Sequence, residues 1–245
     1  MSPKRMASKG TKPVAIVTGA SSGIGRSIAL RLLDLNYKVV GISRKIRDEP
    51  IDHPDFQPLE CDLSEISQIE LCIKTLLSET AIYILVNAAG FGRFRPHEEY
   101  GSMAISKMTN VNLAAPMILC SLFLRTLKKN RGTIINITSI EAVRSSKFSA
   151  LYSATKSGLR AFGQSLFEEV RKSGVNVVTI NPDMTDTNFF EPLNFGISKD
   201  TDAHLLSEDI ADTVEQILTM REGACITEIT IRPQRFGISK KKFEV

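Results

Sequence analysis

The sequence predicts an α/β fold with a doubly wound parallel sheet and helices on both faces. Short runs rich in valine and isoleucine alternate with segments of helical periodicity along nearly the whole chain. The runs are almost continuously apolar, which is typical of strands buried on both faces. A glycine-rich turn at residues 20–25 separates the first run from the first helical segment. Alternation of this kind favours parallel strands joined by crossover helices.

The chain of 245 residues suits a single domain, because no internal repeat or interdomain linker divides it. Hydrophobic residues make up 42% and charged residues 24%, as in ordinary globular proteins. We expect a basic N-terminal extension at 1–12, the domain at 13–233 and a basic C-terminal tail at 234–245.

The first half of the chain supplies four of the seven expected strands. The run after Pro13 ends at Thr18-Gly19, and Asn36 ends the helix that follows. Ser64 is placed to cap the next helix. The apolar face of the first helix consists of Ile24, Ile28, Leu32, Leu33 and Leu35. The expected strands cover 14–17, 37–42, 56–61 and 82–87, a loop covers 44–55, and the second helix covers 64–77.

The second half continues the same alternation. The pattern before residue 130 predicts either two helices or one bent helix. Residues 183–206 lack periodicity and are expected to form a loop. The expected helices cover 102–110, 112–128, 150–172 and 207–220, and the expected strands cover 133–138, 175–180 and 226–231.

The glycine-rich turn indicates a site for a nucleotide phosphate. Its spacing is GxxxGxG rather than GxGxxG, and the sequence has no GxxxxGK[ST] motif of an ATP-type P-loop. Backbone N–H groups at a helix N-terminus bind anions, and glycines let a pyrophosphate approach the backbone. The alternative is a plain tight turn. The expected contacts are Gly19, Ser21, Ser22, Gly23, Ile24 and Gly25.

The end of the second strand predicts the cofactor. An acid there would bind the ribose 2′-hydroxyl of NAD, whereas arginine accommodates the 2′-phosphate of NADP. The strand ends in Ser43-Arg44-Lys45, which contains no acid. Because a guanidinium suits phosphate geometry, these residues predict NADP(H) as the cofactor. The alternative is an exposed basic loop.

Tyr152 and Lys156 lie four residues apart, on one face of the expected helix. A free phenol has a pKa of about 10, and a nearby ammonium lowers it toward the range of useful acid–base catalysts. Ser139 follows the fifth expected strand and could hydrogen-bond the same substrate oxygen as Tyr152. An isolated YxxxK pair is common by chance, but here it accompanies a strand-end serine and a nucleotide turn.

Together these motifs resemble the short-chain dehydrogenase/reductase family, in its branch of about this chain length, from Pro13 to Pro233. Asn112 resembles the catalytic asparagine of the family's central helix. The segment 181–187 resembles the family's NPGxxxT, which flanks the nicotinamide. The further cofactor contacts that the resemblance implies are Asp62, Leu63, Asn87, Ala88, Gly90, Tyr152, Lys156, Pro182, Met184 and Thr187.

Two positions depart from the family's pattern. Ala88 replaces the second asparagine of NNAG, whose amide usually supports the sheet. Asp183 replaces a glycine beside the nicotinamide, although aspartate tolerates turn geometry better than most residues. Neither departure removes a catalytic group.

The resemblance implies a Rossmann-type domain with seven strands that transfers hydride between nicotinamide and a carbonyl or alcohol. Tyr152 would act as general acid or base, Lys156 would bind the nicotinamide ribose, and Asn112 would feed a proton relay through water. Residues 188–206 would form a lid, and members often form dimers or tetramers, here through helices at 102–128 and 150–172. The ending at 226–233 resembles NADP-dependent 3-hydroxy acid dehydrogenases and sepiapterin-reductase-like proteins; a 3-oxoacyl reductase is equally arguable. The expected apolar lining of the lid is Phe189, Phe190, Leu193 and Phe195, with Phe91, Phe94 and Arg95 bordering the pocket. The alternative is ordinary burial of the loop aromatics.

Composition argues against other functions. The surplus of bases lies at the two ends of the chain, where a solubilising role is expected, and no nucleic-acid-reading module is recognisable. Four scattered cysteines and three scattered histidines predict reduced thiols, no metal site and a cytoplasmic location. No apolar run approaches the roughly 18 residues of a membrane helix, so no membrane partner is expected. A non-catalytic NADP-binding regulator or scaffold remains the alternative to an enzyme.

Overall fold

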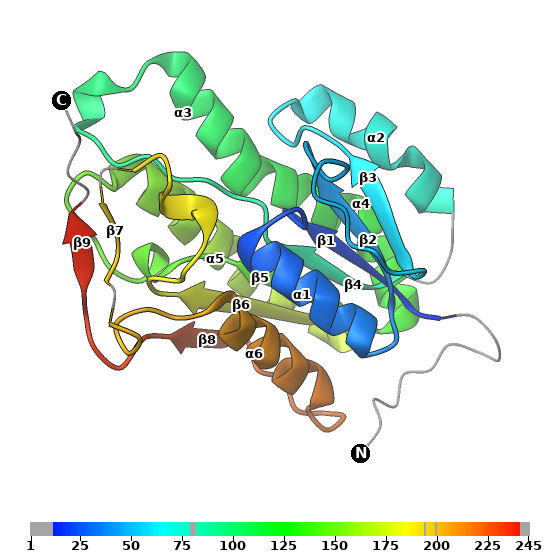
Figure 1. Ribbon diagram of the computed structural model, residues 1–245. Coiled ribbons are helices and arrows are strands. Elements are labelled where there is room, and N and C mark those ends of the chain that lie inside the picture. The colour runs from blue at the N-terminus through cyan, green and yellow to red at the C-terminus, as the bar shows by residue number, and fades with distance from the viewer. Residues whose placement is uncertain (1–11, 79–81, 194, 199, 241–245) are drawn as a thin grey trace.

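The computed structural model describes residues 12–78, 82–193, 195–198 and 200–240 (Figure 1). Within these residues, seven parallel strands form one sheet in the order β3-β2-β1-β4-β5-β6-β8. This arrangement confirms the predicted doubly wound, Rossmann-like α/β fold. The strands of the sheet are β1 (Val14–Thr18), β2 (Lys38–Ser43), β3 (Phe56–Glu60), β4 (Ile82–Asn87), β5 (Thr133–Ile137), β6 (Asn176–Pro182) and β8 (Glu228–Ile231).

Helices cover both faces of the sheet (Figure 1). Alternate residues of each central strand point to opposite faces: Ile135 of β5 packs with α1 and α6, whereas Ile134 packs with α2, α4 and α5. The strands are therefore apolar on both sides, as their sequences indicate. The helices are α1 (Gly23–Asp34), α2 (Ile66–Ser78), α3 (Ser102–Thr109), α4 (Ala115–Asn130), α5 (Ala150–Val170) and α6 (Ser207–Thr219). Short 3-10 turns are η1 (His97–Glu99), η3 (Ile140–Ala142), η4 (Arg171–Ser173) and η5 (Asn188–Phe190).

One bent helical run joins α3 and α4 through a π-helical turn, η2 (Asn110–Ala114). Pro116 lies in the first turn of α4 and has no N–H to donate to the preceding turn, which favours such an irregularity. The run Ser102–Asn130 is the one helix among the described residues that is long and apolar enough to cross a membrane. Its residues Leu119, Phe123 and Leu127 are instead buried against the sheet, as in a core helix.

The carboxyl ends of the strands meet at one edge, and the strand order reverses between β1 and β4. Ligands of open α/β sheets bind at such a switch point. The turn after β1, the loop after β4 and the loops after β5 and β6 all begin at this edge (Figure 1). The fold therefore brings the predicted motifs together although they are spread over most of the chain.

Three segments differ from the sequence prediction. Helix α2 begins at Ile66 rather than Ser64, because Ser64 instead donates its N–H and hydroxyl to Asp62 Oδ1, at 2.9 and 2.8 Å. The expected loop 183–206 contains β7 (Phe195–Ile197), which pairs antiparallel with β9 (Ile238–Lys240). Part of the expected tail 234–245 is therefore paired with the domain. The expected extension lies outside the described residues except for Lys12, which forms an ion pair with Asp55 at 2.6 Å.

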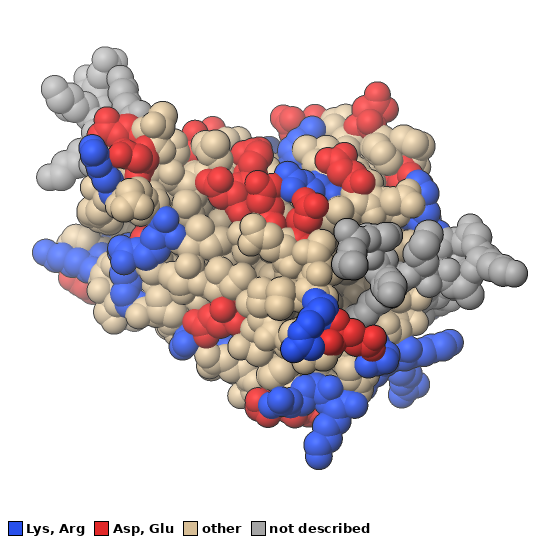
Figure 2. Space-filling view, turned by 90° about the horizontal axis from the view of Figure 1, so that it is seen from below, with Lys and Arg blue, Asp and Glu red and all other residues tan. Residues whose placement is uncertain are grey.

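Charged side chains on the face seen from below in Figure 1 are interspersed rather than segregated by sign (Figure 2). Between α1 and α6, Arg31 forms ion pairs with both Asp212 and Glu215, at 2.5 Å each. Such pairs add little stability at an exposed surface. Arg31 thus bridges two carboxylates from the last turn of α1, at the end of the helix opposite the glycine-rich turn.

Candidate active site

The turn between β1 and α1 has a backbone that only glycine supports. Gly19 and Gly23 have φ angles of +70° and +51°, in the left-handed region. A Cβ atom at Gly25 would lie 2.3 Å from the Gly19 carbonyl oxygen, which is far inside van der Waals contact. Close packing of helix against strand at Gly25 therefore excludes any larger residue.

The N-terminus of α1 fits an anionic group. The Ser22 side chain accepts no hydrogen bond from the first turn of the helix, and that turn contains no acidic residue. The first N–H groups of a helix lack partners within it and carry the positive end of its dipole. A cofactor pyrophosphate can occupy this position without competing with the chain's own groups.

At the ends of β2 and β3, the residues expected near the adenosine ribose lie together. Ser43 Oγ is buried and has no hydrogen-bond partner among the described residues. Arg44 and Lys45 are exposed. Burial is the largest single influence on Asp62 and raises its pKa. Hydrogen bonds from Ser64, with the charges of Arg44 and Lys107, outweigh burial and hold that pKa below its usual value.

The segment after β4 links the nucleotide turn to the candidate catalytic residues. Thr18 Oγ1 accepts the N–H groups of Ala88 and Ala89, each at 3.0 Å. This hydroxyl holds the segment in place although Ala88 lacks the amide found in the family pattern. Just beyond this segment, a Cβ atom at Gly90 would lie 3.1 Å from Lys156 Nζ.

The predicted catalytic residues are also brought together. The buried Lys156 donates from Nζ to the Ile137 carbonyl oxygen at 2.9 Å, and Nζ lies 5.9 Å from the centre of the Tyr152 ring. Ser139 precedes η3 at the end of β5, and its side chain acts to lower the pKa of the Tyr152 phenol. Asn112, in the π-helical turn, donates from Nδ2 to the Phe91 carbonyl oxygen at 2.9 Å. The four side chains come from α5, the π-helical turn and the loop after β5, and Lys156 and Asn112 meet beside Gly90.

Burial changes the protonation of this cluster. It lowers the pKa of the Lys156 ammonium from 10.5 to about 8, because the charged form is poorly solvated. It raises the pKa of the Tyr152 phenol above its ordinary value. The Ser139 side chain opposes this rise, and the negative charge of Glu141 adds to it. Tyr152 therefore holds its proton at neutral pH in this structure.

Aromatic side chains cover Tyr152. The ring centres of Phe94 and Phe189 lie 5.3 and 5.8 Å from that of Tyr152, and Phe195 packs edge-on against Phe94 at 5.3 Å. Gly92 makes room for this group, because a Cβ there would lie 2.7 Å from Phe189. A cavity of about 280 Å³ lies farther out, lined by residues including Asp186, Phe190 and Ser239. Tyr152 is buried, and these aromatic side chains cover part of its ring.

Comparison with known proteins decides the family. The short chain dehydrogenase family pattern matches residues 13–197, which is most of the chain. The chain belongs to the short-chain dehydrogenase/reductase family. It is accordingly an oxidoreductase of a family that binds nicotinamide cofactors.

Several relatives of this dehydrogenase/reductase span the same domain. An uncharacterized oxidoreductase of Staphylococcus epidermidis is 33% identical over 227 residues, which covers 90% of this chain and 96% of the relative. A metagenomic short-chain oxidoreductase in complex with NADP is 29% identical with a TM-score of 0.76, covering 91% of this chain and 97% of the other. A 4-hydroxyisoleucine dehydrogenase complexed with NADH has a TM-score of 0.80 at 23% identity, covering 91% and 98%. The last comparison bears on the fold alone.

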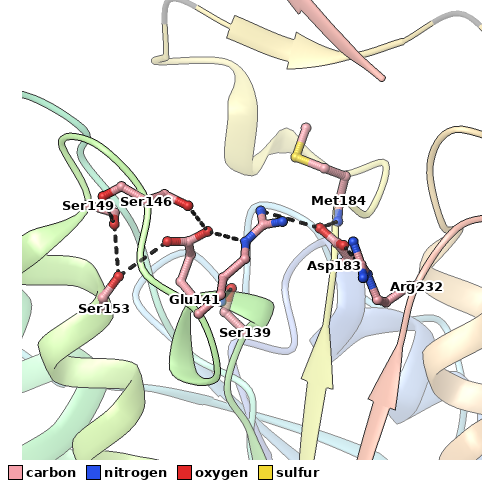
Figure 3. Close-up of polar contacts among 9 residues, drawn as sticks. Ser139, Glu141, Ser146, Ser149, Ser153, Asp183, Met184 and Arg232 are labelled. Carbon is pink, nitrogen blue, oxygen red and sulfur yellow. Dashed lines mark hydrogen bonds and ion pairs between the residues drawn. The ribbon is translucent and has the colours of Figure 1, made fainter. Parts of the chain in front are cut away.

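The segment after β6 contains the clearest departure from the family pattern. Pro182 ends β6, the Thr187 side chain lies 3.0 Å from the Cβ position of Gly23, and Met184 is buried. Asp183, where the short-chain dehydrogenase/reductase pattern has glycine, is also buried, and its carboxylate faces Arg232 and Arg144 (Figure 3).

Glu141 and Arg144, which lie between Ser139 and Tyr152 in the chain, are not among the site residues that the sequence predicts. Neither belongs to a motif with a mechanism attached to its spacing. The one available signal was Asp183 itself, because a buried carboxylate requires cationic or hydrogen-bonding partners.

Proposed function

We propose that this protein is an NADP(H)-dependent oxidoreductase that interconverts a carbonyl compound and its alcohol, with Tyr152 as the general acid or base. The observation that carries the proposal is the convergence of Tyr152, Ser139 and Lys156 at the carboxyl end of β5, beside the loop after β4. A buried, protonated phenol beside a cation can donate a proton to a substrate oxygen as hydride arrives at the adjacent carbon.

Each side chain has a distinct role in this proposal. The Ser139 hydroxyl hydrogen-bonds the substrate oxygen and so fixes it near the phenol of Tyr152. The Lys156 ammonium stabilises negative charge on that phenol and reaches the nicotinamide ribose. Asn112 holds the backbone of Phe91 through both atoms of its amide, with Phe91 N–H donating to Oδ1 at 3.1 Å, and takes part in proton supply through water. The bound nicotinamide cofactor supplies or accepts the hydride.

The preference for NADP(H) rests on the end of β2. Arg44 and Lys45 are exposed there, and residues 43–45 include no acid that would repel a 2′-phosphate. The Ser43 hydroxyl beside them has no hydrogen-bond partner among the described residues. The metagenomic relative that is 29% identical also binds NADP. The cytoplasm, where NADPH favours reduction, is the proposed location, and carbonyl reduction is the proposed direction.

The substrate proposal is an apolar carbonyl compound. The aromatic group of Phe94, Phe189 and Phe195 gives the space over Tyr152 an apolar boundary. A 3-oxo or 3-hydroxy acid derivative with an apolar chain suits this boundary, and a 3-oxoacyl thioester belongs to the same chemical class. A homodimer or homotetramer through α4 and α5 is the proposed assembly, supported by the exposed Met117 on α4.

The proposal is tested by a panel of carbonyl compounds with NADPH consumption followed by absorbance, for the natural protein and for Tyr152→Phe. We expect turnover with the natural protein and a loss of at least about a hundredfold in kcat for Tyr152→Phe, with NADPH binding retained. Tyr100→Phe is the matched control, because its hydroxyl donates to the Arg93 carbonyl oxygen at 2.6 Å near the same aromatic cluster. Unchanged turnover in Tyr152→Phe would contradict the mechanism, and NADPH binding without turnover on any compound would favour a non-catalytic regulator.

A further inference from the structure

Two carboxylates are buried close to the candidate catalytic residues. The side chains of Glu141 and Asp183 are 8% and 1% exposed. They come from different segments, the loop after β5 and the end of β6, and Figure 3 shows dashed contacts from both carboxylates to the arginine side chain that lies between them. A buried carboxylate is stable only when hydrogen bonds and a cation compensate for its lost solvation.

Arg144 connects the two carboxylates. Its Nε lies 2.9 Å from Glu141 Oε1, and its Nη2 lies 3.7 Å from Asp183 Oδ1. A guanidinium is a planar fork with several donors, so it can reach two acceptors that a single ammonium would serve poorly. Arg232 takes the other oxygen of Asp183, with Nε 3.0 Å from Oδ2. The two arginines thus balance the two acids in charge.

Both ends of the bridge are anchored next to catalytic groups. The Glu141 N–H donates to Ser139 Oγ at 3.2 Å, and Glu141 Oε2 accepts the hydroxyl of Ser153, the neighbour of Tyr152, at 3.2 Å. Asp183 Oδ1 accepts the N–H of Met184 at 3.0 Å, in the segment expected to flank the nicotinamide. Arg144 therefore connects the loop that carries Ser139 to the segment after β6, which is expected to flank the nicotinamide.

We propose that Arg144 is a positioning residue, which fixes Ser139 relative to the segment after β6 by bridging Glu141 and Asp183. The role rests on the proposed function, because it concerns the same hydride-transfer site. The role also accounts for the aspartate at position 183, because the glycine of the family pattern has no side chain for Arg144 to bind. Loss of the bridge lets the loop after β5 shift, which moves the Ser139 hydroxyl away from the substrate oxygen.

The test compares Arg144→Met with Arg31→Met. Arg31 is a close structural counterpart, because its side chain is 28% exposed against 34% for Arg144 and it also bridges two carboxylates, Asp212 and Glu215. Thermal unfolding, kcat, KM and NADPH affinity are measured for both variants. We expect comparable losses of thermal stability but a fall in kcat of roughly tenfold to a hundredfold for Arg144→Met alone, as small misplacements of reacting groups produce.

A second readout requires no turnover. Amide hydrogen exchange of the backbone over residues 139–149 should accelerate in Arg144→Met and remain unchanged in Arg31→Met. Asp183→Asn keeps the size of the side chain and its oxygen for the Met184 N–H, but it removes the charge that faces Arg144. The effects of Arg144→Met and Asp183→Asn on kcat should therefore be less than additive when combined.

A third readout, the pH dependence of kcat, separates a change at the proposed active site from a general loss of rigidity in the protein. The negative charge of Glu141 raises the pKa of Tyr152, and Lys156 Nζ lies 5.9 Å from the centre of the Tyr152 ring. Without Arg144, the charge of Glu141 is less compensated and raises the pKa of Tyr152 further. Reduction requires the protonated phenol, so the loss of kcat at alkaline pH should move to higher pH in Arg144→Met. Arg144→Lys, which keeps the charge, should largely restore the natural profile.

The outcomes distinguish this inference from the proposed function. The positioning role of Arg144 would be rejected if Arg144→Met kept the natural kcat and unchanged hydrogen exchange at residues 139–149. It would also be rejected if Arg31→Met lost as much kcat as Arg144→Met. If Arg144→Met does not fold, unchanged exchange and kcat in Asp183→Asn would overturn the bridge in its place. Failure of the proposed function would instead show as Tyr152→Phe matching the natural protein, while the exchange result for Arg144→Met would still report on the bridge.

Discussion

The turn after β1 and the loops after β5 and β6 meet at the same edge of the sheet but hold their groups in different ways. The turn uses backbone N–H groups and glycines, with no acid in the first turn of α1. The loops after β5 and β6 use buried charged side chains, Glu141 and Asp183, with arginines between and beside them. The proposed phosphate-binding side therefore depends on close packing, and the proposed catalytic side depends on compensation of charge.

Among the predictions below, the largest expected effect is on NADPH affinity and comes from disturbing the packing of the turn after β1. Gly25→Ala places a Cβ 2.3 Å from the Gly19 carbonyl oxygen, so the turn or the helix must shift by a substantial fraction of an ångström. We expect the dissociation constant for NADPH to rise at least about a hundredfold, measured by fluorescence titration. Gly101→Ala is the matched control, because a Cβ at Gly101 meets nothing within 4 Å. Natural affinity in a folded Gly25→Ala variant would show that the turn does not form the pyrophosphate site.

Removing the charge of Arg44 at the end of β2 should have an intermediate effect on cofactor affinity. Arg44→Ala removes the guanidinium proposed to bind the 2′-phosphate, and a hydrogen bond to a charged group contributes about 1.5 kcal/mol or more. We expect NADPH affinity to fall about tenfold while NADH affinity changes little. Arg47→Ala is the control from the same loop, since Arg47 is mostly exposed and lies 3.8 Å from Glu60. An equal loss of affinity for both cofactors would remove Arg44 from the 2′-phosphate site.

The difference between the turn after β1 and the loops after β5 and β6 also explains how much of the site the sequence could predict. The turn is recognisable because Gly19, Gly23 and Gly25 are neighbours in the chain and their spacing has a direct geometric meaning. Strands buried on both faces are likewise local patterns. The strand pair β7–β9 is a non-local contact between two strands of three residues each, too short for periodicity to reveal.

The charged network of Glu141, Arg144, Asp183 and Arg232 could not be predicted from the sequence for a related reason. Asp183 and Arg232 are 49 positions apart in the chain, so no spacing rule joins them. The family pattern supplied a position for Asp183 but no partner, because the pattern has glycine there. Compensation between buried charges depends on which loops the finished sheet places side by side. It becomes predictable only once the strand order β5-β6-β8 is known.

Burial of charge on the catalytic side predicts the smallest effect, a pH dependence of stability. Burial lowers the pKa of Lys156 to about 8 in the folded state, against 10.5 for the free side chain. Between these values the unfolded chain binds more protons than the folded one, so this contribution to stability rises with pH. The difference in unfolding free energy between the natural protein and Lys156→Met should be flat below pH 7 and should grow by about 1 kcal/mol from pH 8 to pH 9.

Chemical denaturation at several pH values measures that difference, with Lys129→Met on the exposed face of α4 as the control. The window stays below the ordinary pKa of tyrosine, and burial raises the pKa of Tyr152 further, so the phenol does not titrate in it. A flat difference through pH 9 would mean that Lys156 keeps its proton when buried. The Ile137 carbonyl oxygen, 2.9 Å from Nζ, would then compensate for the lost solvation of the ammonium. In that case backbone groups would hold Lys156, just as backbone groups form the turn after β1. The difference between the two sides of the proposed site would then be limited to Glu141, Asp183 and their arginines.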